Sequence, residues 1–181
     1  MLICSPTTGS ARQSGRARSP LRAARNTDTP NHQSTEMQKP PPKSAFGNPA
    51  DLEVKRAWKN FGRKTTEEAY RIFIQNPFGY VEDFRWIAPA AFTYYFPIVA
   101  RHLTSPDAKS DSDTVSSLAG ILESLLGLHN RELASVFEVI AKLCSHIINH
   151  YSEYDLDYNI HGDVKSRYEH IAKIVSPSAS A

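Results

Sequence analysis

The chain has 181 residues, of which 21 are Lys or Arg, 19 are Asp or Glu and 40% are apolar, a length that accommodates one ordinary domain and an extension. Charged residues interrupt every apolar stretch within about 20 residues, which excludes a membrane-spanning helix. Cys4 and Cys144 are too few and too far apart for a disulfide framework or a four-cysteine zinc site. We therefore expect a reducing, cytoplasmic location.

Residues 1–45 differ in composition from the rest of the chain. They hold seven basic against two acidic residues, a net charge of +5, and leave 14 basic against 17 acidic residues, a net −3, for the remainder. No Phe, Tyr or Trp occurs between Ser5 and Ser44, and this segment ends in the polyproline run Lys39–Lys43. Because such a segment cannot bury enough apolar surface to offset its ordering entropy, we predict a disordered basic leader with a polyproline spacer.

The role of this leader has several interpretations. The apolar run Leu2-Ile3-Cys4 is too short for a secretory signal. An Arg-rich, Ser-rich and acid-poor composition suits an organellar transit peptide, but it suits a solvated tail or an upstream stretch translated before the natural start equally well. We favour the latter two, with Met1 and Met37 both open as start sites. A disordered tail is predicted for residues 176–181, which leaves 46–175 as the folded domain.

The first part of this domain is predicted to be helical. Apolar side chains recur at helical spacing over residues 54–61, and Gly62 ends that helix. Thr65 and Glu68 form a capping box that begins a second helix, although the run 70–74 has the β-branched and aromatic content of a strand. A turn and a connector are expected over residues 76–87 because Asn76-Pro77 ends the helix.

Four further helical patterns complete the domain. A helix from Pro89 to about Leu103 is apolar over most of its circumference, so we expect it to be central. Apolar stripes over 115–126, 133–151 and 164–175 predict three more helices, with Asp113 as the cap of the first. The sequence thus predicts an all-α fold: a single compact bundle of about five to six helices with short connections.

A metal site is one candidate for chemistry in this domain. His146 and His150 are four residues apart on a predicted helix, and Asp155 and Asp157 follow, so an alternative function is a metal-dependent hydrolase using these four residues. The helical angle opposes it, since His146 lies on the side opposite the apolar stripe. We therefore favour a solvated face and expect no metal.

Other catalytic and ligand-binding patterns are weak. The loop with Asp107, Asp111 and Asp113 lacks the Gly and the closing Glu of a calcium loop. No nucleophile elbow and no phosphate-binding glycine loop occurs, so we expect no cofactor and favour a non-enzymatic protein. The leader arginines have no interleaved aromatic residues, so we expect no specific nucleic-acid binding. Cys144, on an apolar helix face, is expected to be a buried and unreactive thiol.

Two parts of the chain together resemble a family of small bacterial proteins of unknown function. They are the run Glu82-Asp83-Phe84-Arg85-Trp86-Ile87-Ala88-Pro89-Ala90-Ala91-Phe92-Thr93-Tyr94-Tyr95-Phe96-Pro97 and the later Gly162-Asp163 and Arg167-Tyr168. The shared pattern is an acidic pair, Ala-Phe-x-Tyr-Tyr-x-Pro and a closing Gly-Asp…Arg-Tyr. The resemblance covers roughly residues 55–175 and none of the leader, which supports Met37 as the start. Since some similar small helical proteins act as immunity or antitoxin partners, it implies by analogy a toxin-like protein partner.

We therefore predict a cytoplasmic helical interaction protein that binds another protein through an acidic surface, with no membrane partner. The candidate binding residues are Glu82, Asp83, Tyr94 and Asp163. Exposed beside the acidic pair, Tyr94 would be an anchor of the kind that dominates interfaces. We expect Asp163 to cap the last helix and to pair with Arg167 four residues later.

Overall fold

The computed structural model describes residues 39–176. The predictions for residues 1–38, including a start at Met37, and for residues 177–181 lie outside the described residues. Within residues 39–176 the predicted all-α fold is confirmed: helices are the regular elements and no strand occurs. The α-helices are α1 (Leu52–Phe61), α2 (Thr66–Phe73), α3 (Pro77–Val81), α4 (Pro89–Leu103), α5 (Ser112–His129), α6 (Phe137–Asn149), α7 (Tyr158–His161) and α8 (Val164–Val175).

Short 3₁₀-helices connect these elements, and two of them correct the predicted boundaries. The segment expected to be a turn and connector contains α3 and then η2 (Glu82–Arg85). Pro77 is suited to the first turn of α3 because that turn does not use its missing N–H group. At the start of the domain, η1 (Lys43–Phe46) packs against α4. The domain therefore begins before residue 46, and the run Lys39–Ala45 that composition assigns to the leader is part of it. The other 3₁₀-helices are η3 (Pro106–Ala108), η4 (Ala134–Val136) and η5 (Tyr151–Glu153).

Helix caps follow the sequence at two of the three predicted positions. The capping box of α2 is present, with Thr65 accepting from the Glu68 N–H group and its own N–H donating to the Glu68 carboxylate. Asp163 caps α8. The prediction of Asp113 as the cap of α5 is wrong, because Asp111 accepts the hydrogen bond from the Thr114 N–H group at 3.3 Å.

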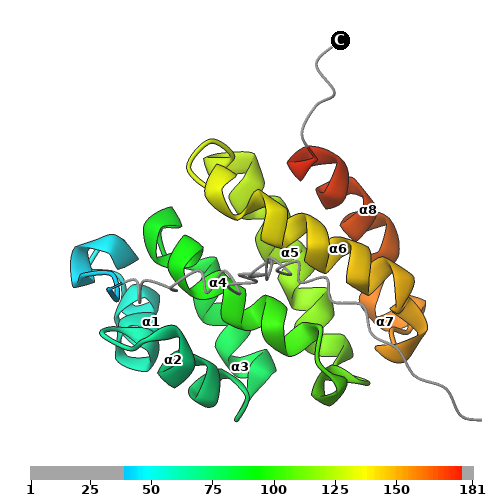
Figure 1. Cartoon of the computed structure of the whole chain (residues 1–181), viewed down its shortest axis with the longest axis horizontal. Coiled ribbons are helices and arrows are strands. Elements are labelled where there is room, and N and C mark those ends of the chain that lie inside the picture. Colours follow the sequence, from blue (N-terminus) through cyan, green and yellow to red (C-terminus); the bar gives the residue numbers. More distant parts are fainter. Residues whose placement is uncertain (1–38, 177–181) are drawn as a thin grey trace, which may run out of the picture. The chain divides into compact units, whose positions relative to one another are not determined.

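The helix α4 is at the centre of the described domain, as predicted. It contacts α2 on one side and α6 on the other, and α8 packs against both α6 and α5 (Figure 1). Large fully buried side chains fill the space between these helices, and two are tyrosines whose hydroxyls are satisfied: Tyr95 donates to the Phe61 carbonyl at 2.6 Å and Tyr168 to the Val115 carbonyl at 2.8 Å. None of the helices in residues 39–176 is long and apolar enough to cross a membrane.

Candidate binding cleft

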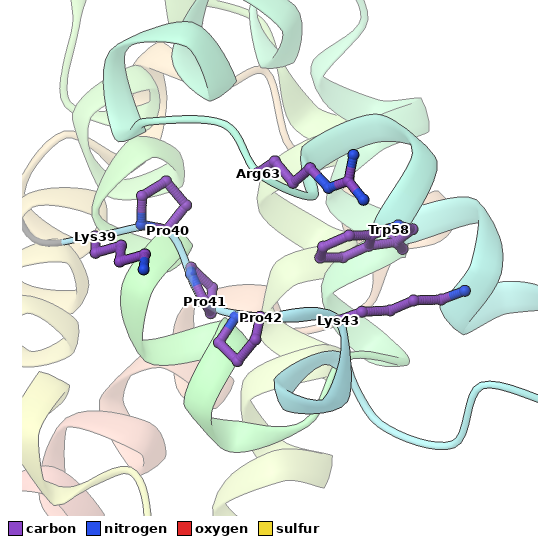
Figure 2. Close-up of a pocket in the computed structure, with 7 residues that line it drawn as sticks. All are labelled: Lys39, Pro40, Pro41, Pro42, Lys43, Trp58 and Arg63. Carbon is purple, nitrogen blue, oxygen red and sulfur yellow. The ribbon is translucent and has the colours of Figure 1, made fainter.

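A cleft of about 720 Å³ opens between the polyproline run and the end of α1 (Figure 2). Figure 2 shows the prolines along one wall and the Trp58 and Arg63 side chains along the other. Its lining consists of apolar surfaces and cations: Lys39, Pro40, Pro41, Pro42, Lys43, Trp58 and Arg63. Three other cavities within residues 39–176 are smaller, with volumes of about 150, 270 and 380 Å³.

The proline wall has an extended backbone that its own sequence dictates. A proline ring fixes φ near −65°, and the residue before a proline is driven to the extended region. Lys39, Pro40 and Pro41 each precede a proline, and Pro42 itself has φ −69° and ψ 166°. The run then enters η1, where fully buried Phe46 attaches it to the core. The wall is therefore stiff and has an apolar anchor.

The opposite wall depends on how α1 ends. Trp58 is half-buried, with the Phe46 ring edge-on to its indole at a centroid distance of 5.0 Å. The Gly62 N–H group donates to the Trp58 carbonyl at 2.7 Å, and a Cβ atom on Gly62 would lie only 2.4 Å from the indole. Arg63 then has a left-handed φ of 65°, and its guanidinium lies 5.8 Å from the centroid of the Trp58 ring. The backbone turn thus places a cation beside the indole.

The cleft is positively charged although the domain carries a slight negative charge. Lys39, Lys43 and Arg63 line it, and none of its lining residues is acidic. The prolines and the indole supply the apolar contact surface. Aromatic side chains line grooves in which proteins hold extended peptides, and charged groups at the margin of such a groove help to select the ligand. The arrangement can therefore bind an extended, apolar and anionic group.

Asp83, predicted to lie on the binding surface, is fully buried. Its carboxylate accepts hydrogen bonds from the Arg56 Nε atom at 2.7 Å and from the Asn60 amide at 2.6 Å, which join η2 to α1. The prediction that Asp83 is part of an exposed acidic surface is therefore wrong. The pairing with Asp83 raises the pKa of Arg56 above its ordinary value, against the smaller effect of burial.

Glu82 is half-buried and also has partners within the domain. Its carboxylate accepts from the Arg85 Nε atom at 3.0 Å and from the Ser117 hydroxyl, so it links η2 to α5. Partial burial opposes ionisation, but the bonds from Arg85 and Ser117 outweigh it and keep the pKa of Glu82 below its ordinary value. Glu82 and Asp83 therefore hold η2 in place between two helices.

Tyr94 and Asp163 lie elsewhere on the domain. The Tyr94 ring is half-buried near the start of α2 and lies edge-on to the Tyr95 ring at a centroid distance of 4.7 Å. Burial raises the pKa of Tyr94 above its ordinary value, and the hydrogen bond with the backbone of Thr66 only partly opposes this effect. Asp163 is exposed, and its carboxylate accepts from the Ser166 N–H group at 3.0 Å. The four predicted residues therefore do not form one site.

The expected pairing of Asp163 with Arg167 is wrong. Arg167 instead donates to the Glu123 carboxylate of α5 through its Nη2 atom at 2.7 Å and its Nε atom at 3.1 Å. This pair fastens α8 to α5 and raises the pKa of Arg167. A spacing of four residues on a helix permits an ion pair between Asp163 and Arg167, but the Arg167 guanidinium binds Glu123 of another helix instead.

The alternative metal site has its residues in two places. The His146 and His150 rings are stacked with centroids 4.4 Å apart and line a cavity of about 150 Å³, where His150 also bonds Glu153 at 2.9 Å. Asp155 and Asp157 line a different cavity. Across residues 39–176, no group of three or more His, Cys, Asp or Glu side chains is placed to hold a metal ion.

Two further titratable groups are deeply buried. Cys144 packs in the core, where burial raises the pKa of its thiol to about 12, as expected for an unreactive cysteine. His102 is 3% exposed, and its Nε2 atom lies 3.1 Å from the Asp111 carboxylate. Burial works against ionisation of Asp111, but its bonds to His102 and Thr114 keep its pKa below the ordinary value. This pair was not predicted from the sequence.

We expect Asp111→Asn to lower the free energy of unfolding by about 1 kcal/mol near neutral pH. Asparagine still caps α5, so the change isolates the carboxylate charge. Because the folded-state pKa of Asp111 is lowered, its stabilising effect is present above the unfolded-state value and is lost as the pH falls through the folded-state value. The difference between the two proteins in the free energy of unfolding, measured with urea, should therefore narrow as the pH falls below about 5. A constant difference over this range would contradict the prediction.

The cleft was not predicted from the sequence, because Lys39–Lys43 was interpreted as a spacer and Trp58 as a core residue. A signal was present in their combination: a stiff proline run lies a short distance before a helix that carries tryptophan.

Comparison of the chain with family models, with curated proteins and with solved structures finds no match. The resemblance to a bacterial family therefore stays a prediction.

Proposed function

We propose that residues 39–176 form a protein-binding module whose docking site is the cleft between Lys39–Lys43 and the end of α1. The observation that carries this proposal is the lining of the cleft, in which three prolines and an indole face each other and three cations surround them. Such a surface offers apolar contact at little entropic cost, because a proline has few conformations to lose on binding.

The same lining favours binding over catalysis in this cleft. Its residues include no carboxylate, imidazole, thiol or hydroxyl, the groups that most often act as nucleophiles or general bases. The docking site also replaces the acidic surface predicted from Glu82 and Asp83, since Asp83 is buried and Glu82 is hydrogen-bonded within the domain. A toxin-like partner is the form of this proposal that the family resemblance implies.

A site-specific photocrosslinker tests the proposal. Placed at exposed Lys43, at the margin of the cleft, it should capture a defined protein in the cells that express the chain, and the same probe at exposed Lys173 on α8 should not. Introducing Trp58→Ala into the Lys43 probe protein should abolish the capture, provided that circular dichroism shows the helices intact. Equal capture at both positions, or none at Lys43, would remove the cleft as a protein-binding site.

A further inference from the structure

We infer that the ligand of this cleft is an acidic segment of a partner protein, bound in an extended conformation with its carboxylates against Lys39, Lys43 and Arg63. The inference rests on the proposed function and specifies the chemistry of the partner. It depends on three observations: the charge of the lining, the spacing of its cations and the electrostatics of the rest of the domain.

The charge of the lining selects an anion. From residue 46 onward the chain has 17 acidic residues and 14 basic ones, and one of these basic residues is Arg63 of the cleft. No acidic residue lines the cleft. Arg63 is exposed and adopts a left-handed φ of 65°, a conformation that costs a non-glycine residue about 1 kcal/mol. An unpaired cluster of three cations beside an indole is best complemented by carboxylates.

The spacing of the cations indicates an extended ligand. Lys39 and Lys43 are at the two ends of the proline wall (Figure 2), four residues apart in the chain. A polyproline backbone rises about 3.1 Å per residue, which separates their Cα atoms by about 12 Å. An extended peptide rises about 3.3 Å per residue, so acidic residues about four positions apart would match the two lysines. The side chains between them would face the prolines and the Trp58 indole.

The rest of the domain disfavours a nucleic acid. Nucleic-acid binding needs basic surface along several phosphates and aromatic rings for successive bases. Trp58 is the only aromatic residue lining the cleft, and acidic residues outnumber basic ones outside it. The acidic residues outside the cleft would repel a long polyanion. A short acidic peptide places its carboxylates within the cleft alone and avoids this repulsion.

A fluorescence titration tests the inference with a synthetic peptide that carries two glutamates about four residues apart, separated by prolines and a leucine. In a Trp86→Phe background Trp58 is the only tryptophan, so its emission reports binding at the cleft. We expect the peptide to shift this emission and to lose the effect in high salt, which screens exposed charge pairs. Lys39→Glu/Lys43→Glu should weaken binding at least about tenfold. The matched control, Lys165→Glu/Lys173→Glu, makes the same charge change on α8 and should bind as tightly as the parent.

The outcomes separate this inference from the proposed function. If a glutamine version of the peptide binds as tightly, or if excess peptide added before irradiation fails to prevent the crosslinking of a protein through Lys43, the acidic ligand is wrong while the docking site stands. If no protein is captured and a single-stranded oligonucleotide shifts the Trp58 emission instead, both proposals are wrong. If the acidic peptide binds, and the lysine reversal weakens this binding while leaving the thermal unfolding unchanged, the inference is supported.

Discussion

Replacing Arg56 with methionine should lower the free energy of unfolding by about 2 kcal/mol. The Asp83 carboxylate is fully buried and would keep only the Asn60 amide as a hydrogen-bond donor. The cost is below that of breaking a fully buried pair, because the Arg56 side chain is 47% exposed and some of its interaction is screened by water. Urea unfolding monitored by circular dichroism measures the change.

The double variant Arg56→Met/Asp83→Leu should recover most of this loss, since removing both charges leaves no unpaired carboxylate in the core. Arg71→Met is the matched control: Arg71 is 72% exposed and lies 3.7 Å from Glu67 on the surface, so its loss should have no measurable effect. A cost for Arg56→Met no larger than that of the control would show that Asp83 does not depend on this guanidinium.

Gly62→Ala should cost about 2 kcal/mol and displace the wall of the cleft. The added Cβ atom would lie 2.4 Å from the Trp58 indole and 2.5 Å from the Trp58 carbonyl oxygen, so both the ring and the end of α1 must move. We expect a change in Trp58 emission in the Trp86→Phe background. We also expect the affinity for the acidic peptide to fall by more than the decrease in the folded fraction of the protein explains.

Gly127→Ala provides the control for this glycine. Gly127 is exposed within α5, and nothing lies within 4 Å of the position of its added Cβ atom. Alanine there should stabilise the domain by about 0.5–1 kcal/mol, because glycine is a poor helix former. An unchanged Trp58 emission in Gly62→Ala would contradict the role of Gly62 in setting the indole.

The helices were largely predictable because their signals are local. Apolar spacing placed α1, α4 and α8, and the Thr65–Glu68 capping box placed the start of α2. Where two local signals competed, the sequence could not decide between them. Both Asp111 and Asp113 suit the start of α5, and Asp111, which caps the helix, also has the buried His102 as a partner from α4.

The site was less predictable because its determinants are tertiary. An adjacent acidic pair such as Glu82 and Asp83 is usually solvated, and the partners that bury Asp83 come from residues 23 and 27 positions earlier. The proline run was assigned to the leader by composition, which averages over many residues. The 3₁₀-helix η1, with its fully buried Phe46, attaches that run to the domain through contacts with α1 and α4.

The proline wall also bears on the thermodynamics of recognition. Its backbone is already confined before a ligand binds, so binding should cost less conformational entropy in the receptor than binding to a groove lined by loops. Release rates would then be governed by a small number of ring contacts and ionic contacts. Exchanging the three prolines for serines would leave the lining charges in place but increase the conformational entropy that this segment loses on binding.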